Sequence, residues 1–194
     1  MHIPEPLAKL YDWIEHNGWV QQRAQGGGAD GRCGYLYPLD QLNANWTDEQ
    51  RLGGTTVEFR AEGSEHLGAW LGAEPAAAAA RLCVFAKTGA DGSMAALWLD
   101  DTDAQHIVHM GSGSGSTLTC VLASDARDFL RLLAIGYDEI CWPDCFDQTP
   151  AESFEVGGLV VEPNDAYRAW LYETYPGITI PERASEIVRT PANM

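Results

Sequence analysis

The chain has 194 residues, of which 45% are hydrophobic, so it can bury a sizeable core as a single domain over residues 1–194. No stretch approaches the ~20 apolar residues of a membrane span, and the first residues lack the basic and apolar regions of a signal peptide. A cytoplasmic protein without membrane contact is therefore expected. The formal net charge of −16 disfavours nucleic acid as a partner and favours a basic one.

The negative charge is concentrated in one part of the chain. Residues 88–167 carry 14 acidic and 2 basic residues, whereas residues 1–87 carry 11 acidic and 7 basic ones. No Lys or Arg occurs between Arg131 and Arg168. Such an excess can serve solubility alone, or it can attract a basic partner at long range. Its confinement to one segment favours a partner.

The first third of the chain predicts one clear helix followed by weaker patterns. Apolar residues from Leu7 to Ile14 recur at helical spacing, and Gly18 can end that helix. Residues 21–34 contain five glycines without apolar periodicity, which predicts a flexible loop. A short helix is expected within 38–52 and a strand over 55–60. The alanine run after Pro75 fits either an exposed helical turn or a spacer.

Residues 81–123 predict an antiparallel meander of four strands. The first two strands, 81–87 and 94–99, flank Asp91-Gly92, a dipeptide that strongly favours a hairpin. An acidic connection over 100–105 leads to a third strand at 107–110. Residues 111–116 read as a flexible tip, and a fourth strand follows over 118–123.

Two helices follow the meander. Ser124 can cap the first, which Gly136 can end. The second begins at Asn164 and stops near Gly177, and a loosely ordered tail is expected from residue 178. Strands in a run with helices at both ends indicate an α+β fold, with an antiparallel sheet of about four to six strands covered by helices.

Motifs that would carry catalysis or bind a cofactor fail on spacing or context. The run Gly111-Ser-Gly-Ser-Gly-Ser116 has the wrong sixth position for a dinucleotide loop and precedes a strand instead of a helix. That same context excludes a serine-hydrolase nucleophile turn. His106 and His109 are three apart on a strand and so point to opposite faces. No catalytic residue and no cofactor are therefore predicted.

Metal sites are not predicted either. Asp100, Asp101 and Asp103 begin like a calcium loop, but the glycine and glutamate that such a loop needs later are missing. Cys141 and Cys145 have three intervening residues and no second cysteine pair, which is unsuited to zinc. An odd total of five cysteines indicates reduced thiols.

Several short motifs resemble those of the SUKH superfamily. They are Phe85-Ala-x-x-Gly89-x-x-Gly92-Ser93, Leu97-Trp98, His109-x-Gly111-Ser112, and Asp128-Phe129-Leu130-x-Leu132-Leu133-Ala134-x-Gly136-Tyr137. An N-terminal helix that ends in glycine and a late Tyr167-x-x-Trp170-Leu171 helix also fit. The resemblance spans about two thirds of the chain. Residues 21–80 match the family motifs poorly and are not assigned by it.

This resemblance implies a single α+β domain without enzymatic activity. Many SUKH members neutralise a bacterial toxin, often a nuclease or nucleic-acid deaminase, by direct binding, and one is a fungal regulator of cell-wall synthesis. We therefore expect an immunity protein that binds a basic cognate toxin. A regulatory or scaffold module of the same fold is the alternative, and a small hydrolase or metal-dependent enzyme is a third. The oligomeric state stays open.

The expected partner-binding residues come from the two acidic regions of the chain. They are Asp100, Asp101, Asp103, Asp138, Glu139, Asp144, Asp147, Glu152 and Glu155. A carboxylate-rich surface can imitate a phosphate backbone and steer the association of a basic protein.

Overall fold

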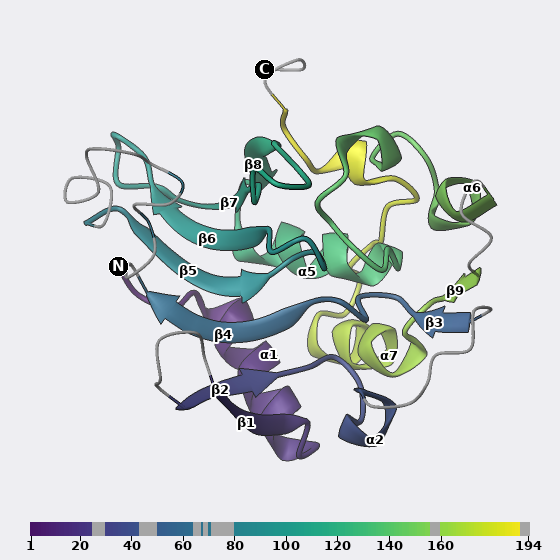
Figure 1. Ribbon diagram of the computed structural model, residues 1–194. Coiled ribbons are helices and arrows are strands. Elements are labelled where there is room, and N and C mark those ends of the chain that lie inside the picture. The colour runs from purple at the N-terminus through teal and green to yellow at the C-terminus, as the bar shows by residue number, and fades with distance from the viewer. Residues whose placement is uncertain are drawn as a thin grey trace.

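The chain folds around a seven-stranded antiparallel sheet. The computed structural model describes residues 1–24, 30–42, 50–63, 67, 70, 80–155 and 160–190. Helices α1 (Glu5–His16) and α5 (Ala126–Ile135) lie on the same face of this sheet (Figure 1). The predicted α+β class is confirmed. The sheet has seven strands, one more than the largest number in the predicted range of four to six.

The strand order in the sheet is β1-β2-β4-β5-β6-β7-β8, so sequential neighbours pair except where β3 is skipped. These strands are Val20–Ala24 (β1), Asp30–Gly34 (β2), Glu58–Gly63 (β4), Leu82–Lys87 (β5), Met94–Leu99 (β6), Gln105–Met110 (β7) and Thr119–Ala123 (β8). A separate parallel pair joins β3 (Gln50–Leu52) to β9 (Val160–Glu162). The four-strand meander predicted over 81–123 corresponds to β5–β8.

The remaining elements are short. They are α2 (Leu39–Leu42), the 3-10 turn η1 (Pro143–Cys145), α6 (Pro150–Glu155), α7 (Asp165–Thr174) and the 3-10 turn η2 (Ala184–Glu186). Helix α2 falls within the predicted helical region 38–52, and α7 confirms the predicted last helix. The alanine run over 75–79 lies outside the described residues.

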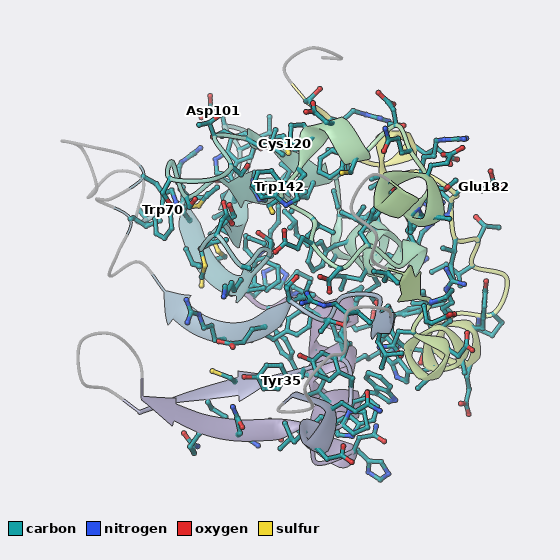
Figure 2. All side chains as sticks on the ribbon, turned by 45° about the vertical axis from the view of Figure 1, so that its right-hand side comes forward. Tyr35, Trp70, Asp101, Cys120, Trp142 and Glu182 are labelled. Carbon is teal, nitrogen blue, oxygen red and sulfur yellow. The ribbon has the colours of Figure 1, made fainter. Side chains whose placement is uncertain are left out.

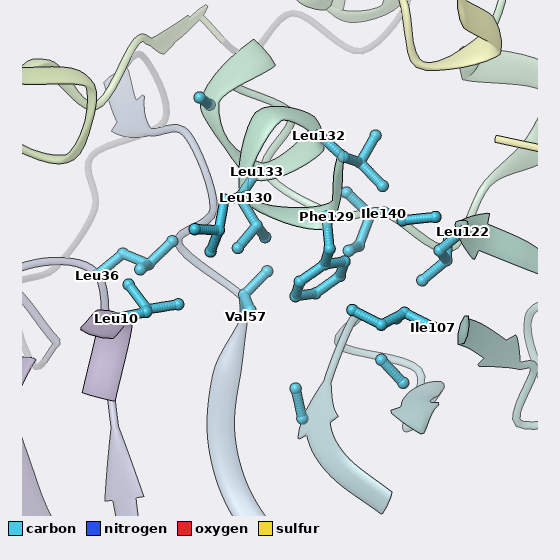
Figure 3. Close-up of a cluster of buried hydrophobic side chains, with 14 of the residues drawn as sticks. Leu10, Leu36, Val57, Ile107, Leu122, Phe129, Leu130, Leu132, Leu133 and Ile140 are labelled. Atoms are coloured by element: carbon cyan, nitrogen blue, oxygen red, sulfur yellow. The ribbon is translucent and has the colours of Figure 1, made fainter. Parts of the chain in front are cut away.

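Alternation along β6 divides the core between the two sheet faces. Ala95 and Leu97 face the helices and contact the main cluster, whereas Met94 and Ala96 belong to a second cluster on the other face with Leu67. In the main cluster, Phe129 of α5 is fully buried (Figure 3). Its ring meets that of Phe85 edge-on, with centroids 5.6 Å apart.

The N-cap of α5 differs from the prediction by one residue. Asp125, not Ser124, has the extended backbone of a cap, and its carboxylate accepts hydrogen bonds from the amides of Arg127 and Asp128. A carboxylate at this position also interacts favourably with the helix dipole. Gly136 ends the helix with a φ of 109°, as expected for a left-handed C-cap.

The loop predicted over residues 21–34 is wrong for most of its length. Strands β1 and β2 pair there from Val20–Gly34 to Ala24–Asp30. Their polar side chains suit an edge hairpin, where apolar periodicity is weak. Gly34 lets α1 approach, because a Cβ there would lie 3.0 Å from Ile14 Cγ2. Residues 25–29 lie outside the described residues.

The predicted loose tail from residue 178 is also wrong as far as residue 190. Ala184, Ile187 and Val188 are buried, and Arg189 forms a backbone bridge with Val121 of β8. These three apolar side chains are too few and too irregularly spaced to reveal a packed segment by periodicity. The tail therefore completes the core and covers one edge of the sheet.

The helices differ in length and hydropathy from membrane-crossing segments. None of those in the described part of the chain combines the length and the hydropathy that a crossing requires.

Candidate acidic binding site

The serine-rich connection between β7 and β8 folds around a carboxylate. Asp91, in the β5–β6 turn, accepts hydrogen bonds from the amide and hydroxyl of Ser93, each 2.9 Å long. It also accepts from the Ser112 hydroxyl at 2.8 Å and the Ser116 amide at 2.7 Å. We call these four residues the Asp91 cluster.

The Asp91 cluster changes the interpretation of Gly111–Ser116. Burial opposes ionisation of Asp91, but the amides and hydroxyls around it outweigh that effect and lower its pKa to about 2. The Ser112 hydroxyl and the Ser116 amide, which a phosphate-binding loop would offer to a ligand, are thus already engaged by the ionised carboxylate. The segment that was predicted as a flexible tip is a binding loop for an internal anion.

The two histidines of β7 have separate environments, as their spacing predicted. His109 is fully buried on the helix-covered face, and its Nδ1 lies 2.9 Å from the Leu118 carbonyl. Burial lowers the pKa of His109, although that carbonyl and the charge of Asp91 oppose the shift. His106 is half-buried and contacts Asp100 and the Ser124 carbonyl.

The predicted contact loop over 100–103 is partly engaged in its own structure. The Asp100 carboxylate accepts from His106, Thr102 and the Ala104 amide, and the His106 hydrogen bond is the largest cause of its lowered pKa. Asp101 and Asp103 are exposed, with Arg81 nitrogens 2.9 Å and 3.9 Å from their carboxylates. Only these two are open to a partner.

The second predicted region begins with a residue that is not on the surface. The Asp138 side chain is only 6% exposed, and its Oδ2 accepts a 2.9 Å hydrogen bond from Arg51 of β3. Burial raises the pKa of Asp138 and Glu139 adds to this, whereas Arg51 and the nearby Thr55 hydroxyl oppose it. Asp138 is therefore a buried carboxylate paired with Arg51 and not an exposed surface group, while its contact with a partner stays a prediction.

Glu139 and Trp142 form the adjoining surface. Glu139 is half-buried and accepts a 2.7 Å hydrogen bond from the Ala90 amide. It also accepts from the indole N–H of Trp142, a residue that is 39% exposed, and this hydrogen bond orients the ring. A large, oriented and exposed aromatic residue is a common centre of a protein interface.

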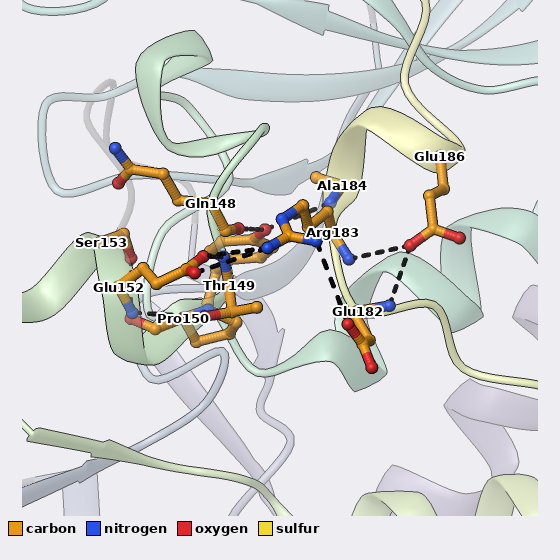
Figure 4. A network of polar contacts seen from close by, with 10 residues as sticks. Gln148, Thr149, Pro150, Glu152, Ser153, Glu182, Arg183, Ala184 and Glu186 are labelled. Atoms are coloured by element: carbon orange, nitrogen blue, oxygen red, sulfur yellow. Dashed lines mark hydrogen bonds and ion pairs between the residues drawn. The ribbon is translucent and has the colours of Figure 1, made fainter.

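The other predicted carboxylates lie further along the same segment. Asp144 in η1 and Asp147 are exposed. Glu152 of α6 accepts from the Thr149 amide at 2.7 Å and faces Arg183 at 3.4 Å (Figure 4). Those contacts, the Thr149 amide first, lower the pKa of Glu152. Glu155 is the last residue of α6, and its side chain lies outside the described set.

The structure does not bring the two predicted acidic regions into one cluster. Loop 100–103 follows the last residue of β6, whereas Glu139 contacts Ala90, in the turn before its first residue. Six residues of strand span roughly 20 Å at ~3.3 Å per residue, so the regions lie at opposite ends of β6 (Figure 1). Figure 2 labels one residue from each, Asp101 and Trp142.

A cavity of about 270 Å³ opens beside Asp138, and we call it the Asp138 cavity. It is lined by Arg51, Tyr137, Asp138, Glu139, Trp142, Cys145 and Ser153. Arg51 could not have been assigned to this site from sequence, because it lies far from Asp138 along the chain and in no motif. Trp142 was recognisable only as one aromatic residue among many.

Burial disfavours the ionised thiolate form of three of the five cysteines. All five cysteines are free, and burial raises the pKa values of Cys120, to about 12, and of Cys141 and Cys145. Within the part of the chain that the structure describes, no group of three or more His, Cys, Asp or Glu side chains could hold a metal ion.

Comparison with known proteins adds no relative. Searches of protein-family models, of curated proteins and of solved structures return no match to this chain. The structure itself establishes an α+β fold with a cavity beside Asp138.

Proposed function

We propose that the protein is a cytoplasmic, non-enzymatic immunity protein that binds and neutralises a basic protein toxin. The observation that carries the proposal is the surface of Glu139, Trp142, Asp144 and Asp147. It combines an exposed aromatic side chain with three carboxylates on a segment that has no Lys or Arg between residues 131 and 168. A nuclease or nucleic-acid deaminase is the expected target class, because enzymes that hold nucleic acid present basic clefts.

The chemistry of this surface suits such a target. Exposed carboxylates attract a basic protein over several ångströms, and the attraction weakens as salt screens it. The aromatic side chain contributes contact area in a way that salt does not screen. Together they predict a fast, salt-sensitive association and a complex that persists at physiological salt.

The direct test is growth rescue and co-purification with the product of a neighbouring toxin-like gene. We expect co-expression to restore growth and to give a stoichiometric complex that loosens as salt rises. If neither rescue nor complex is observed with a neighbouring toxin, immunity is excluded for that pair and a regulatory module of the same fold becomes the better hypothesis.

Neutralising the acidic surface should slow association. The variant Glu139→Gln/Asp144→Asn/Asp147→Asn removes three charges, and we expect about a tenfold lower association rate constant at low salt, with a shallower salt dependence. Stopped-flow mixing with the toxin measures both quantities.

A charge-matched control comes from other parts of the molecule. The variant Asp101→Asn/Asp103→Asn/Glu173→Gln, in which Glu173 is an exposed residue of α7, also removes three charges. We expect less than a threefold effect on the same rate constant. Equal effects from both variants would show that net charge, and not the surface around Trp142, determines association.

A further inference from the structure

The Asp138 cavity contains a buried acceptor that the fold leaves unused. Asp138 Oδ1 and Arg51 Nε both lack a hydrogen-bond partner within the described residues, whereas Asp138 Oδ2 accepts from Arg51 Nη1. The Thr55 hydroxyl lies close enough to Asp138 to oppose the rise in its pKa, but its hydrogen bond goes to the Leu52 carbonyl. A buried carboxylate oxygen without a donor is costly, so such groups in native proteins commonly mark a place where a donor binds.

The charges around the cavity indicate whether the donor group that binds there should be positively charged or neutral. Among the lining residues that the structure describes, Asp138 and Glu139 are acidic and Arg51 is the one basic residue. Arg51 already pairs with Asp138 at 2.9 Å, so the charge of Glu139 is left without a cationic partner among the lining residues. The cavity therefore favours a cation over a neutral or anionic group.

The volume of the cavity and its aromatic lining residues indicate which kind of cation would fit. A volume of about 270 Å³ suits one long side chain better than a whole cofactor. Tyr137 and Trp142 line the cavity, and the Trp142 ring is held by its indole hydrogen bond to Glu139. Aromatic faces next to a carboxylate bind a guanidinium well, because the ring attracts the cation while the oxygens accept its N–H groups.

We propose that the Asp138 cavity is a binding site for a single basic side chain, an arginine before a lysine, presented by the protein partner. This inference rests on the proposed function, which supplies the basic partner, and it identifies the position at which that partner is anchored. The guanidinium donates to Asp138 Oδ1 and lies against the Trp142 ring, so the partner is recognised by one inserted side chain as well as by general attraction.

The site can be tested without the partner. N-acetyl-arginine amide is titrated into the full chain while the indole N–H signal of Trp142 is followed by NMR, with the assignment taken from Trp142→Phe. We expect a saturable shift with a dissociation constant in about the millimolar range, as suits one small side chain. N-acetyl-lysine amide should bind more weakly, and N-acetyl-citrulline amide, which is neutral and nearly the same shape, should give no saturable shift.

Variants locate the binding. Glu139→Gln should weaken the arginine probe about fivefold by NMR, whereas Asp144→Asn, a charge loss on the same segment outside the cavity lining, should change it less than twofold. Asp138→Asn should abolish binding. If that buried substitution unfolds the chain, the Glu139→Gln and Asp144→Asn pair decides the question alone.

The outcomes separate this inference from the proposed function. No saturable shift, or an equal response to the arginine and citrulline probes, overturns the cavity site, since the unused oxygen would then be satisfied by water. Either result can be obtained whether or not the protein rescues growth in the co-expression test. A chain that rescues growth but ignores the probe retains its function without this anchor.

Discussion

Replacing Asp91 with alanine is expected to lower the free energy of unfolding by about 3 kcal/mol, because four donors lose their acceptor together. Two of these donors are backbone amides, of Ser93 and Ser116, and two are hydroxyls, of Ser93 and Ser112. The change also releases the β7–β8 loop from the β5–β6 turn. Urea unfolding at pH 7 measures the loss.

The pH dependence of this effect has a defined direction. The folded-state pKa of Asp91 is lowered to about 2, so its stabilising contribution is complete above the ordinary value of 3.8 and is lost as pH falls toward 2. The difference in stability between wild type and Asp91→Ala should therefore shrink between pH 5 and pH 2. Asp144→Ala, which alters an exposed carboxylate, is the control and should cost less than about 0.5 kcal/mol. If the difference in unfolding free energy between wild type and Asp91→Ala stayed constant with pH, the role assigned to the ionised carboxylate would be contradicted.

Replacing Gly53 with alanine should destabilise the fold by about 3 kcal/mol for a steric reason. A Cβ on Gly53 would lie 2.5 Å from the Cα of Gly136 and 2.8 Å from its carbonyl oxygen, so the obstacle is backbone and cannot rotate away. The neighbouring amides of Gly54 and Thr56 donate to the carbonyls of Tyr137 and Asp138. The same substitution should therefore displace the wall of the Asp138 cavity.

Gly177→Ala is the matched control for this prediction. Gly177 has a φ of 83° but nothing within 4 Å of its Cβ position, so alanine there incurs a conformational cost of roughly 1 kcal/mol without a clash. Thermal unfolding of both variants compares the two effects. If Gly53→Ala were no more destabilising than Gly177→Ala, the close approach of the two backbones would not be a tight constraint.

Local patterns in the sequence were sufficient for the elements whose stability is local. Helix α5 has a continuous apolar stripe and a glycine stop, and the β5–β6 hairpin has Asp-Gly between two apolar runs, so both were predicted at nearly their observed positions. Strand β1 was missed because its hairpin with β2 is polar and lacks apolar periodicity. The tail near Ile187 was missed because its order comes from contacts with distant parts of the chain, such as the bridge between Arg189 and Val121. Periodicity contains no information on such contacts.

The acidic site was predicted in composition but not in geometry. Charge counting identified Asp138 and its neighbours, yet it treated each carboxylate as exposed. Whether a carboxylate is a surface group or a buried one depends on its partner, and Arg51 reaches Asp138 from a strand far away in sequence. The Asp91 cluster was missed for the same reason, since it joins a turn to a serine-rich loop that looks like a flexible linker.

The parallel pairing of β3 with β9 has a consequence for the order in which the molecule assembles. Strands β5–β8 are joined by short turns and can form early, whereas β3 and β9 join residues near 50 to residues near 160 and close a long loop. Arg51 belongs to the β3–β9 pair, so we expect the Asp138 cavity to be completed after the sheet has formed. We therefore expect the amide of Arg51 to exchange with deuterium much sooner than that of Leu97 in native-state hydrogen exchange, and equal protection would refute this order.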